Sequence, residues 1–289
     1  MHTFGYARPQ SLPEAVALIA ENGEQASLLA GGTDLTVGLR HGTTTPRFVI
    51  DVKRLRDLPP AIVATEARVR ISATTVLTDL VGHDAVRRHF PSLVEAADVV
   101  GSIQIRNRAT LAGNICNASP AADTVPVLVV LGASVTVFGP GGEREVPVVD
   151  FILGNRRTDL GQGELVIAVN IPVPTRPIGT AFARMTRRRG VDLATINLCC
   201  RTDEDGTTTF AYGAVSPKPL LVQDTSGILA DPAASAHAKS AALDALLAQA
   251  APITDVRASK EYRLAMLRVL SRRTLYRATE ALATRRRNG

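Results

Sequence analysis

The sequence predicts a protein of the α+β class, in which helices and strand pairs follow one another along the chain. Two observations carry this prediction. Apolar strand patterns flank short turns in the first two thirds of the chain, most clearly around 139–142. Three more strand patterns, at 180–187, 195–201 and 207–215, suggest an antiparallel sheet that helical patterns follow. With 289 residues, the chain can form two or three packed units.

Composition argues against several classes of protein. No charge-free run of about 18 apolar residues occurs, so we expect no membrane span. The first six residues lack the basic start and apolar run of a secretory signal, and we expect a cytoplasmic protein. Cys116, Cys199 and Cys200 are too few for an iron–sulfur cluster, which takes four thiolates. We expect them to be core residues, with Cys199 and Cys200 on opposite faces of a strand.

The first part of the chain alternates helix and strand. The segment 9–24 is typical of a helix, because Ser11 can cap it and its apolar residues form one stripe. The predicted elements after it are a strand, a turn, a short helix and a strand, at 27–30, 31–34, 35–41 and 48–52.

The next part predicts strand pairs and helices. One strand pair flanks a charged turn, two helices follow with an interruption at Pro91, and a hairpin surrounds 139–142. In chain order these elements are 61–64, 69–72, 75–82, 85–100, 134–138, 144–148 and 165–171. The proline-rich segment 172–177 is the best candidate domain boundary. Beyond the C-terminal strands, 233–250 and 259–285 predict helices.

Positive charge is concentrated at the C-terminal end, although the whole chain has a formal net charge of only +6. From residue 260 onward, only Glu261 and Glu280 oppose the basic residues, which are Lys260, Arg263, Arg268, Arg272, Arg273, Arg277, Arg285, Arg286 and Arg287. This pattern favours a solvated helix face with a basic end. The alternatives are a docking surface for an acidic partner chain and nucleic-acid binding, and we expect no nucleic-acid partner.

The common signatures of nucleotide and hydrolytic sites are missing from the sequence. No Walker A sequence occurs and no G-x-G-x-x-G follows a strand, so a Rossmann unit is not predicted. The five histidines lack metal-ligand spacing. We therefore expect neither a metal site nor a catalytic residue in this chain.

Two glycine-containing segments are the strongest functional signal. They are 29–35, Leu-Ala-Gly-Gly-Thr-Asp-Leu, and 110–123, which begins Thr-Leu-Ala-Gly-Asn. Each combines small residues and short polar side chains at the end of an apolar run, which lets a backbone approach a phosphate closely. We interpret the pair as a site for a dinucleotide cofactor. For the first segment alone, a strand-to-helix turn capped by Thr33 or Asp34 is an equal alternative.

Together the two segments resemble those of the FAD-binding medium subunit of molybdenum hydroxylases, of the carbon monoxide, xanthine and nicotine dehydrogenase type. The resemblance runs the whole length and includes 48–51, 71–75, 163–166, 188–194 and 213–219. It implies a two-lobed FAD-binding domain of the vanillyl-alcohol-oxidase (PCMH) type over 1–174, with lobes of about 1–57 and 58–174. A C-terminal domain over 175–289, with a three-stranded antiparallel sheet and helices, is also implied.

The resemblance implies a set of cofactor-binding residues, namely Leu29, Ala30, Gly31, Gly32, Thr33, Asp34, Leu35, Thr110, Gly113, Asn114, Ala118, Asp123, Leu165, Val166, Arg184 and Asp192. The segment 29–35 would offer its amides and the Thr33 hydroxyl to the FAD pyrophosphate. Thr110, Gly113 and Asn114 would hold the pyrophosphate from the other side. Asp123 would accept hydrogen bonds from the adenosine part, a role that suits a carboxylate.

At the flavin end, the resemblance places Leu165 or Val166 near the isoalloxazine ring. Arg184 and Asp192 would approach the flavin from the C-terminal domain. Many relatives have lysine where Arg184 stands, and arginine keeps the charge but changes its geometry. For Asp192, the capping of a turn is an equal alternative.

The resemblance implies an electron-transfer function. In this family the substrate is hydroxylated at a molybdopterin cofactor in a large subunit, and electrons pass through two-iron two-sulfur clusters of a small subunit. They then leave through FAD to an external acceptor. FAD would be this chain's own cofactor, the large and small subunits its partners, and a dimer of heterotrimers the assembly. The alternatives are a self-contained FAD-dependent oxidoreductase with its own substrate and a scaffold subunit that has lost FAD.

Overall fold

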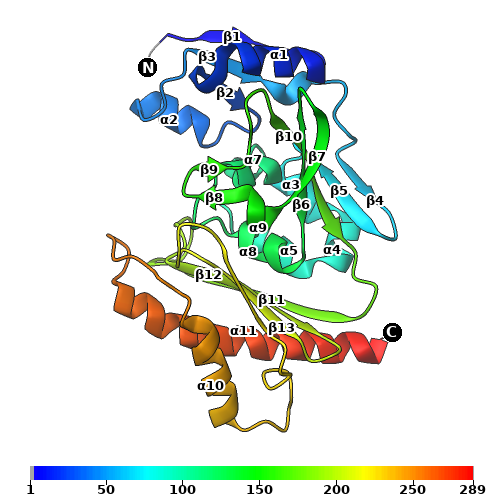
Figure 1. Cartoon of the computed structure of the whole chain (residues 1–289), viewed down its shortest axis with the longest axis vertical. Helices are drawn as coiled ribbons and strands as arrows, with labels where there is room; N and C mark the ends of the chain where they lie inside the picture. The colour runs from blue at the N-terminus through cyan, green and yellow to red at the C-terminus, as the bar shows by residue number, and fades with distance from the viewer. Residues whose placement is uncertain (1–2, 289) are drawn as a thin grey trace.

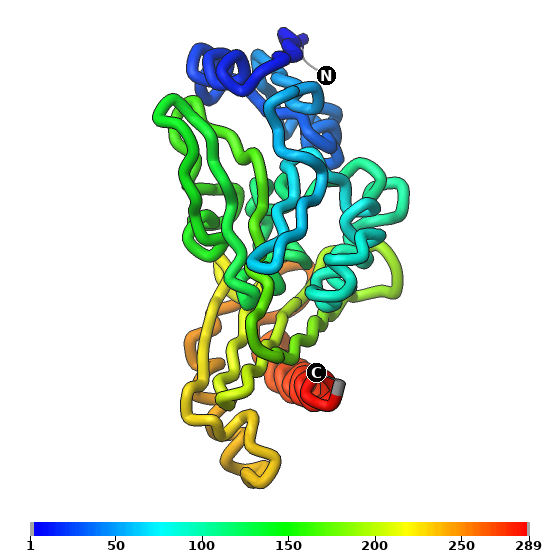
Figure 2. The backbone as a smooth tube through the Cα atoms, turned by 90° about the vertical axis from the view of Figure 1, so that its right-hand side faces the viewer, coloured from blue at the N-terminus to red at the C-terminus, as the bar shows by residue number. Residues whose placement is uncertain are grey.

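The computed structural model describes residues 3–288 and arranges them around three larger sheets (Figure 1). A small parallel sheet lies at one end of the long axis and a five-stranded antiparallel sheet in the middle. At the other end, a four-stranded antiparallel sheet is covered by the long C-terminal helix (Figure 2). The hairpin β8 (Ile152–Gly154) and β9 (Arg157–Thr158) forms a fourth, two-stranded sheet.

The first sheet explains where the first glycine segment lies. The elements are β1 (Gly5–Ala7), α1 (Leu12–Asn22), β2 (Ala26–Leu29), α2 (Leu35–His41) and β3 (Phe48–Asp51), with the short 3₁₀ turns Gly23–Gln25 and Val52–Arg54. The strand order is β1-β3-β2 and both pairings are parallel. Ser11 caps α1, as predicted. Residues 30–34 follow β2, so they leave the sheet at the carboxyl ends of its strands, where parallel sheets commonly bind ligands.

The middle sheet carries most of the helices. Its elements in chain order are β4 (Ile62–Ala64), β5 (Arg68–Ser72), α3 (Leu77–Gly82), α4 (Asp84–His89), α5 (Pro91–Asp98), α6 (Ile103–Arg106), α7 (Leu111–Cys116), α8 (Thr124–Val130), β6 (Ser134–Gly139), β7 (Gly142–Pro147), α9 (Val148–Phe151) and β10 (Leu165–Pro172). The strand order is β4-β5-β10-β6-β7, with every pairing antiparallel. Pro91 begins α5 and divides the helix predicted over 85–100, at the predicted position.

Strand β10 connects the cores of the first two sheets. Leu165 and Ile167 pack with apolar residues of the parallel sheet and α1. Val166 and Val169 pack on the other side, with the helices of the middle sheet. A bulge between Val166 and Ala168 shifts the alternation by one residue, which explains why two residues three positions apart share a face.

The C-terminal sheet has one strand more than predicted. Its elements are β11 (Ile178–Met185), β12 (Ile196–Asp203), β13 (Thr208–Gly213), β14 (Leu220–Asp224), α10 (Ala236–Leu247) and α11 (Lys260–Asn288). The four strands pair in chain order and every pairing is antiparallel. The prediction of a three-stranded sheet was therefore wrong, because it lacked the edge strand β14. This strand is five residues long and follows a proline-rich turn, so its alternating pattern is too short to stand out.

Helix α11 lies directly on β11 and β12. A Cβ at Gly179 would overlap the carbonyl oxygen of Ala278, so glycine permits the close approach of strand and helix. Cys199 packs toward the middle sheet and Cys200 toward α11, on opposite faces of β12 as predicted. Burial raises the pKa of both thiols. The two cysteines therefore contribute to two different cores.

Several arginines of α11 bind other parts of the chain and do not simply face solvent. Arg277 donates to the carbonyl oxygen of Phe182 at 2.7 Å and forms an ion pair with Glu95 at 2.9 Å. Arg285 donates to the carbonyl oxygens of Arg88 and His89 at the end of α4. Arg277 is exposed to solvent as predicted and Arg285 is half-buried, and both also bind groups that a prediction from charge alone did not include.

Within residues 3–288, no helix combines the length and the apolar character that crossing a bilayer requires. The same residues contain no group of three or more His, Cys, Asp or Glu side chains that could hold a metal ion.

Candidate cofactor-binding site

The turn between β2 and α2 depends on two glycines. Gly32 has a φ of +75°, a conformation that side chains with a Cβ rarely adopt. A Cβ at Gly31 would overlap the carbonyl oxygen of Arg108, which precedes the second glycine-containing segment. Each glycine is therefore needed for a different reason, Gly32 for the turn and Gly31 for contact with the backbone that leads into the second segment.

The turn presents a run of backbone N–H groups without partners. Among residues 3–288, no acceptor binds the amides of Gly31, Gly32, Thr33 or Asp34. Asp34 stands at the start of α2, but its side chain makes no capping hydrogen bond. The backbone carbonyl of Gly32 is satisfied, because it accepts from Thr36 at 3.0 Å. Successive free amides in such a turn form a concave site for an anion.

The second segment forms the short helix α7. The hydroxyl of Thr110 caps this helix by accepting from the N–H of Gly113 at 2.9 Å. Leu111, Ala112 and Ile115 are buried and fix the helix on the middle sheet. A Cβ at Gly113 would meet Thr110 Oγ1 at 2.8 Å, and apart from its chain neighbours and the backbone of α7 no other described atom would lie within 4 Å. Open space therefore lies in front of Gly113.

Side chains join the two segments across about eighty residues of sequence. Asn117, just after α7, donates from Nδ2 to Asp34 Oδ1 at 3.3 Å. Its Oδ1 accepts from the guanidinium of Arg156, in the turn between β8 and β9. Asn114 Oδ1 accepts from the hydroxyl of Thr124 at 2.7 Å, which fixes α7 against α8. The two glycine-containing segments therefore lie side by side.

Asp123 ends the second segment and is held by the C-terminal sheet. Only 7% of the residue is exposed. Its Oδ2 forms an ion pair with Arg184 of β11 at 2.8 Å, and its Oδ1 accepts from Asn197 of β12 at 3.0 Å. Burial raises the pKa of Asp123, while Asn197 and Arg184 act in the opposite direction. The C-terminal sheet therefore meets the second glycine-containing segment at this carboxylate.

The residues present fit a dinucleotide. The free amides suit a pyrophosphate, and the gap at Gly113 permits close approach from the second side. No acidic residue lies in the first turn of α2 or α7. The carboxylate of Asp34 precedes α2, where Asn117 binds its Oδ1.

Comparison with known proteins decides the family. The family described as "FAD binding domain in molybdopterin dehydrogenase" matches residues 2–174, and "CO dehydrogenase flavoprotein C-terminal domain" matches 180–278. The chain belongs to the FAD-binding medium subunits of molybdenum hydroxylases.

Individual relatives cover nearly all of the FAD-binding subunit. The xanthine dehydrogenase FAD-binding subunit of Escherichia coli O157:H7 is 31% identical over 281 residues, which are 96% of each chain. The carbon monoxide dehydrogenase medium chain of Hydrogenophaga pseudoflava is 32% identical over 276 residues, 94% of this chain and 96% of the relative. A solved structure of carbon monoxide dehydrogenase from that organism has a TM-score of 0.88 at 31% identity, covering 97% of this chain and 98% of the other.

The FAD-binding subunit brings most of the predicted residues into one region. Segment 29–35, α7 and Asp123 form it together with Arg184 from β11. Ala118 has a φ of +45° and is buried, so it shapes the turn through its backbone.

The predicted residues near the flavin ring are less clearly connected to this region. Leu165 and Val166 are both buried, on opposite sides of β10. Asp192 caps its own turn by accepting from the backbone N–H groups of Arg187 and Leu193, and the hydrogen bonds from Arg187 lower its pKa. This is the capping geometry that the sequence left open as an alternative. The contacts of these three residues with a flavin remain predictions.

Sequence reasoning missed three residues that build the region. Arg108 lies against Gly31, Asn117 joins the two segments, and Asn197 binds Asp123. An asparagine inside the apolar strand pattern 195–201 was a detectable signal, because a buried amide requires partners.

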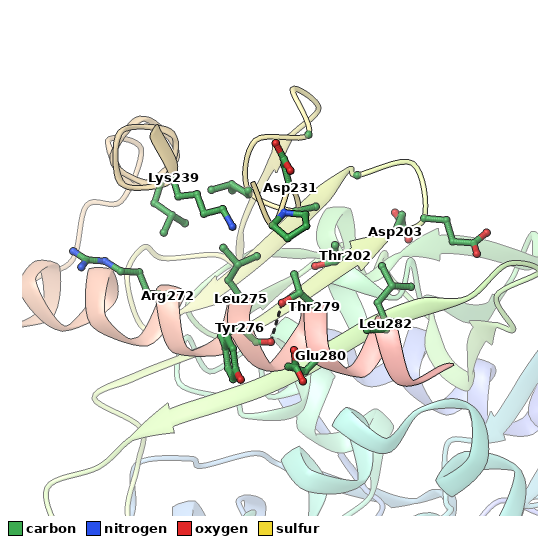
Figure 3. A pocket seen from close by; sticks show the side chains of 18 of the residues that line it. Thr202, Asp203, Asp231, Lys239, Arg272, Leu275, Tyr276, Thr279, Glu280 and Leu282 are labelled. Carbon is green, nitrogen blue, oxygen red and sulfur yellow. Dashed lines mark hydrogen bonds between the residues drawn. The ribbon is translucent and has the colours of Figure 1, made fainter. Parts of the chain in front are cut away.

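A separate cavity of about 790 Å³ lies in the C-terminal part of the subunit (Figure 3). It is bounded by α10, α11, the β12–β13 turn and the loop 227–232, and Leu229, Leu243, Leu275 and Leu282 line it. None of the predicted cofactor-binding residues lines this cavity. The cavity is therefore separate from the proposed FAD site.

Proposed function

We propose that this subunit holds FAD with the pyrophosphate between its two glycine-containing segments. The run of free amides from Gly31 to Asp34 is the observation that carries the proposal, because such amides stabilise negative charge. On the other side, Thr110, Gly113 and Asn114 would hold the pyrophosphate. Asp123 would accept hydrogen bonds from the hydroxyl groups of the adenosine part.

The same proposal assigns the remaining predicted residues to the flavin end. Leu165 and Val166 would contribute apolar packing near the isoalloxazine ring, and Asp192 would approach it from the C-terminal sheet. The resemblance also placed Arg184 near the ring, but its ion pair with Asp123 favours a place for Arg184 beside the adenosine part. We also propose that 1–174 is the FAD-binding domain, with lobes of about 1–57 and 58–174, and that 175–289 is a second domain.

Bound FAD supplies the redox chemistry, and the protein binds, orients and shields it. The subunit would hold FAD where electrons from two-iron two-sulfur clusters of a small partner subunit leave to an external acceptor. Substrate hydroxylation would occur on a large molybdopterin subunit. The names of the relatives, a xanthine dehydrogenase FAD-binding subunit and a carbon monoxide dehydrogenase medium chain, support this division of tasks. We propose a dimer of heterotrimers in the cytoplasm.

The test begins with the full chain purified alone. We expect a yellow protein, or a colourless one that becomes yellow with added FAD, and no substrate oxidation without partners. A chain that binds no FAD in either case contradicts the proposal and favours a scaffold role. A chain that oxidises a substrate alone favours a self-contained flavoenzyme. Purification from the native host should yield a large and a small subunit with molybdenum and iron.

Two variants test the assigned residues. Gly113→Val adds a side chain beside α7, with its Cβ 2.8 Å from Thr110 Oγ1, and Asp123→Ala removes the carboxylate. We expect both to weaken FAD binding while the far-ultraviolet circular dichroism stays that of a folded protein. Gly82→Ala is a matched control, because a Cβ at Gly82 would meet no described atom within 4 Å. Unchanged FAD occupancy in both variants contradicts the assignment.

A further inference from the structure

Asn197 lies at the point where the C-terminal sheet meets the second glycine-containing segment. It is fully buried on β12, which packs against α8 (Figure 1). Its Nδ2 donates to Asp123 Oδ1 at 3.0 Å and to the carbonyl oxygen of Ala121 at 3.3 Å. One amide group therefore holds both the backbone and the side chain of the turn that precedes α8.

The neighbouring strand is shaped to admit this amide. Gly213 on β13 is the register partner of Asn197. A Cβ at Gly213 would overlap Asn197 Oδ1 and would lie 2.9 Å from the carbonyl oxygen of Pro120. That carbonyl accepts from the N–H of Ala214 at 2.7 Å. The end of β13 thus binds the same turn through its backbone and leaves room for Asn197.

Arg184 completes the arrangement from β11. Its ion pair with Asp123 uses the carboxylate oxygen that Asn197 leaves free. A second nitrogen of Arg184 donates to the carbonyl oxygen of Gly190, in the loop that also holds the Arg187–Asp192 pair. On the other side of the turn, the backbone N–H of Arg156 donates to the carbonyl oxygen of Ala118. Of these charged groups, only Arg184 pairs with Asp123.

We propose that Asn197 is a positioning residue for FAD binding, which holds the carboxylate of Asp123 in one orientation so that its remaining lone pairs face the cofactor. The proposal rests on the function proposed above. A carboxylate with two fixed donors loses little rotational freedom on binding a third group, and such preorganisation favours affinity. The C-terminal sheet would in this way contribute to FAD affinity without needing a contact of Asn197 with FAD.

The test measures the dissociation constant of FAD for the full chain at pH 8 and pH 6. Asn197→Asp places a second carboxylate beside Asp123, and two such groups share one proton at low pH and repel each other at high pH. We expect FAD binding about tenfold weaker than wild type at pH 8 and restored to within about threefold at pH 6. Leucine at position 197 cannot donate a hydrogen bond at either pH, so we expect Asn197→Leu to bind FAD about tenfold more weakly than wild type at both pH values.

Asn170 provides a matched control. It is also a buried strand asparagine, its Nδ2 donates to Thr136 Oγ1 at 2.8 Å, and its Oδ1, like that of Asn197, has no partner among the described residues. We expect Asn170→Asp to bind FAD like wild type at both pH values, even where it lowers the melting temperature. Recovery at pH 6 in this control as well would overturn the proposal, because a general stability effect would then explain both variants.

The remaining outcomes separate this inference from the proposed function. Wild-type chain that binds no FAD contradicts the proposed function itself. If the wild-type chain binds FAD and folded Asn197→Asp binds it equally well, the positioning role is overturned while the proposed FAD site still holds. If the aspartate variant does not fold, the same result in folded Asn197→Leu has this meaning.

Discussion

The Cα of Gly31 lies so close to the carbonyl oxygen of Arg108 that no Cβ fits between them. This contact joins the first glycine-containing segment, through backbone alone, to the residues just before the second. The turn after β2, whose sequence is also compatible with an ordinary strand-to-helix turn, is therefore one side of a contact between two distant parts of the chain.

Gly31→Ala should separate the segments and weaken FAD binding by at least about tenfold, because the clash is with backbone that cannot rotate away. Titration of the purified chain with FAD, followed by flavin fluorescence, measures the effect. Gly82→Ala, at a position without such a neighbour, should bind FAD like wild type. Equal affinity in the Gly31 variant would show that the contact is dispensable.

Thr110→Val should lower the free energy of unfolding by about 1 kcal/mol, since valine has the same shape but cannot accept the hydrogen bond from Gly113. Thr110→Ser keeps the hydroxyl acceptor, so its free energy of unfolding should fall by less than that of Thr110→Val. Urea unfolding followed by circular dichroism compares the three proteins. A valine variant as stable as wild type contradicts the capping role.

Two arginines of α11 should differ sharply in their contribution to stability. Arg263 is 1% exposed and binds Asp255 at 2.6 Å as well as the carbonyl oxygens of Thr195 and Ala214. Arg263→Met removes this donor from the two carbonyl oxygens, while Asp255 keeps its ion pair with Arg257, and should cost about 3 kcal/mol. Arg268 pairs with Asp244 at the surface, and Arg268→Met should cost less than about 1 kcal/mol. Thermal unfolding of both variants checks this, and similar losses would contradict it.

Glu164 should contribute to the loss of stability in acid. Hydrogen bonds from the Arg144 guanidinium lower the pKa of Glu164 below its ordinary 4.5. Its contribution is therefore present above about pH 4.5 and is lost as the pH falls through the folded pKa. Melting temperatures between pH 6 and pH 3 should fall less steeply for Glu164→Gln than for wild type. Parallel curves would indicate that this pair does not affect acid stability.

Local chemistry explains what could be predicted. The turn at Pro91, the cap at Ser11 and the opposite faces of Cys199 and Cys200 each depend on neighbouring residues only. The short edge strand β14 was missed, because pairing with β13 and not its own pattern defines it. Asn197 was missed for a similar reason, since its partner Asp123 lies 74 residues away.

The sequence by itself determined the family, the two segments with their glycines, and most of the helices and strands. These features are written in spacing and residue type over a few positions. Only the tertiary structure decided that Gly31 lies against Arg108, that Arg184 and Asn197 meet at Asp123, and that arginines of α11 bind distant carbonyl groups. Such pairs join elements whose separation depends on how the sheets pack, and no local pattern encodes that distance.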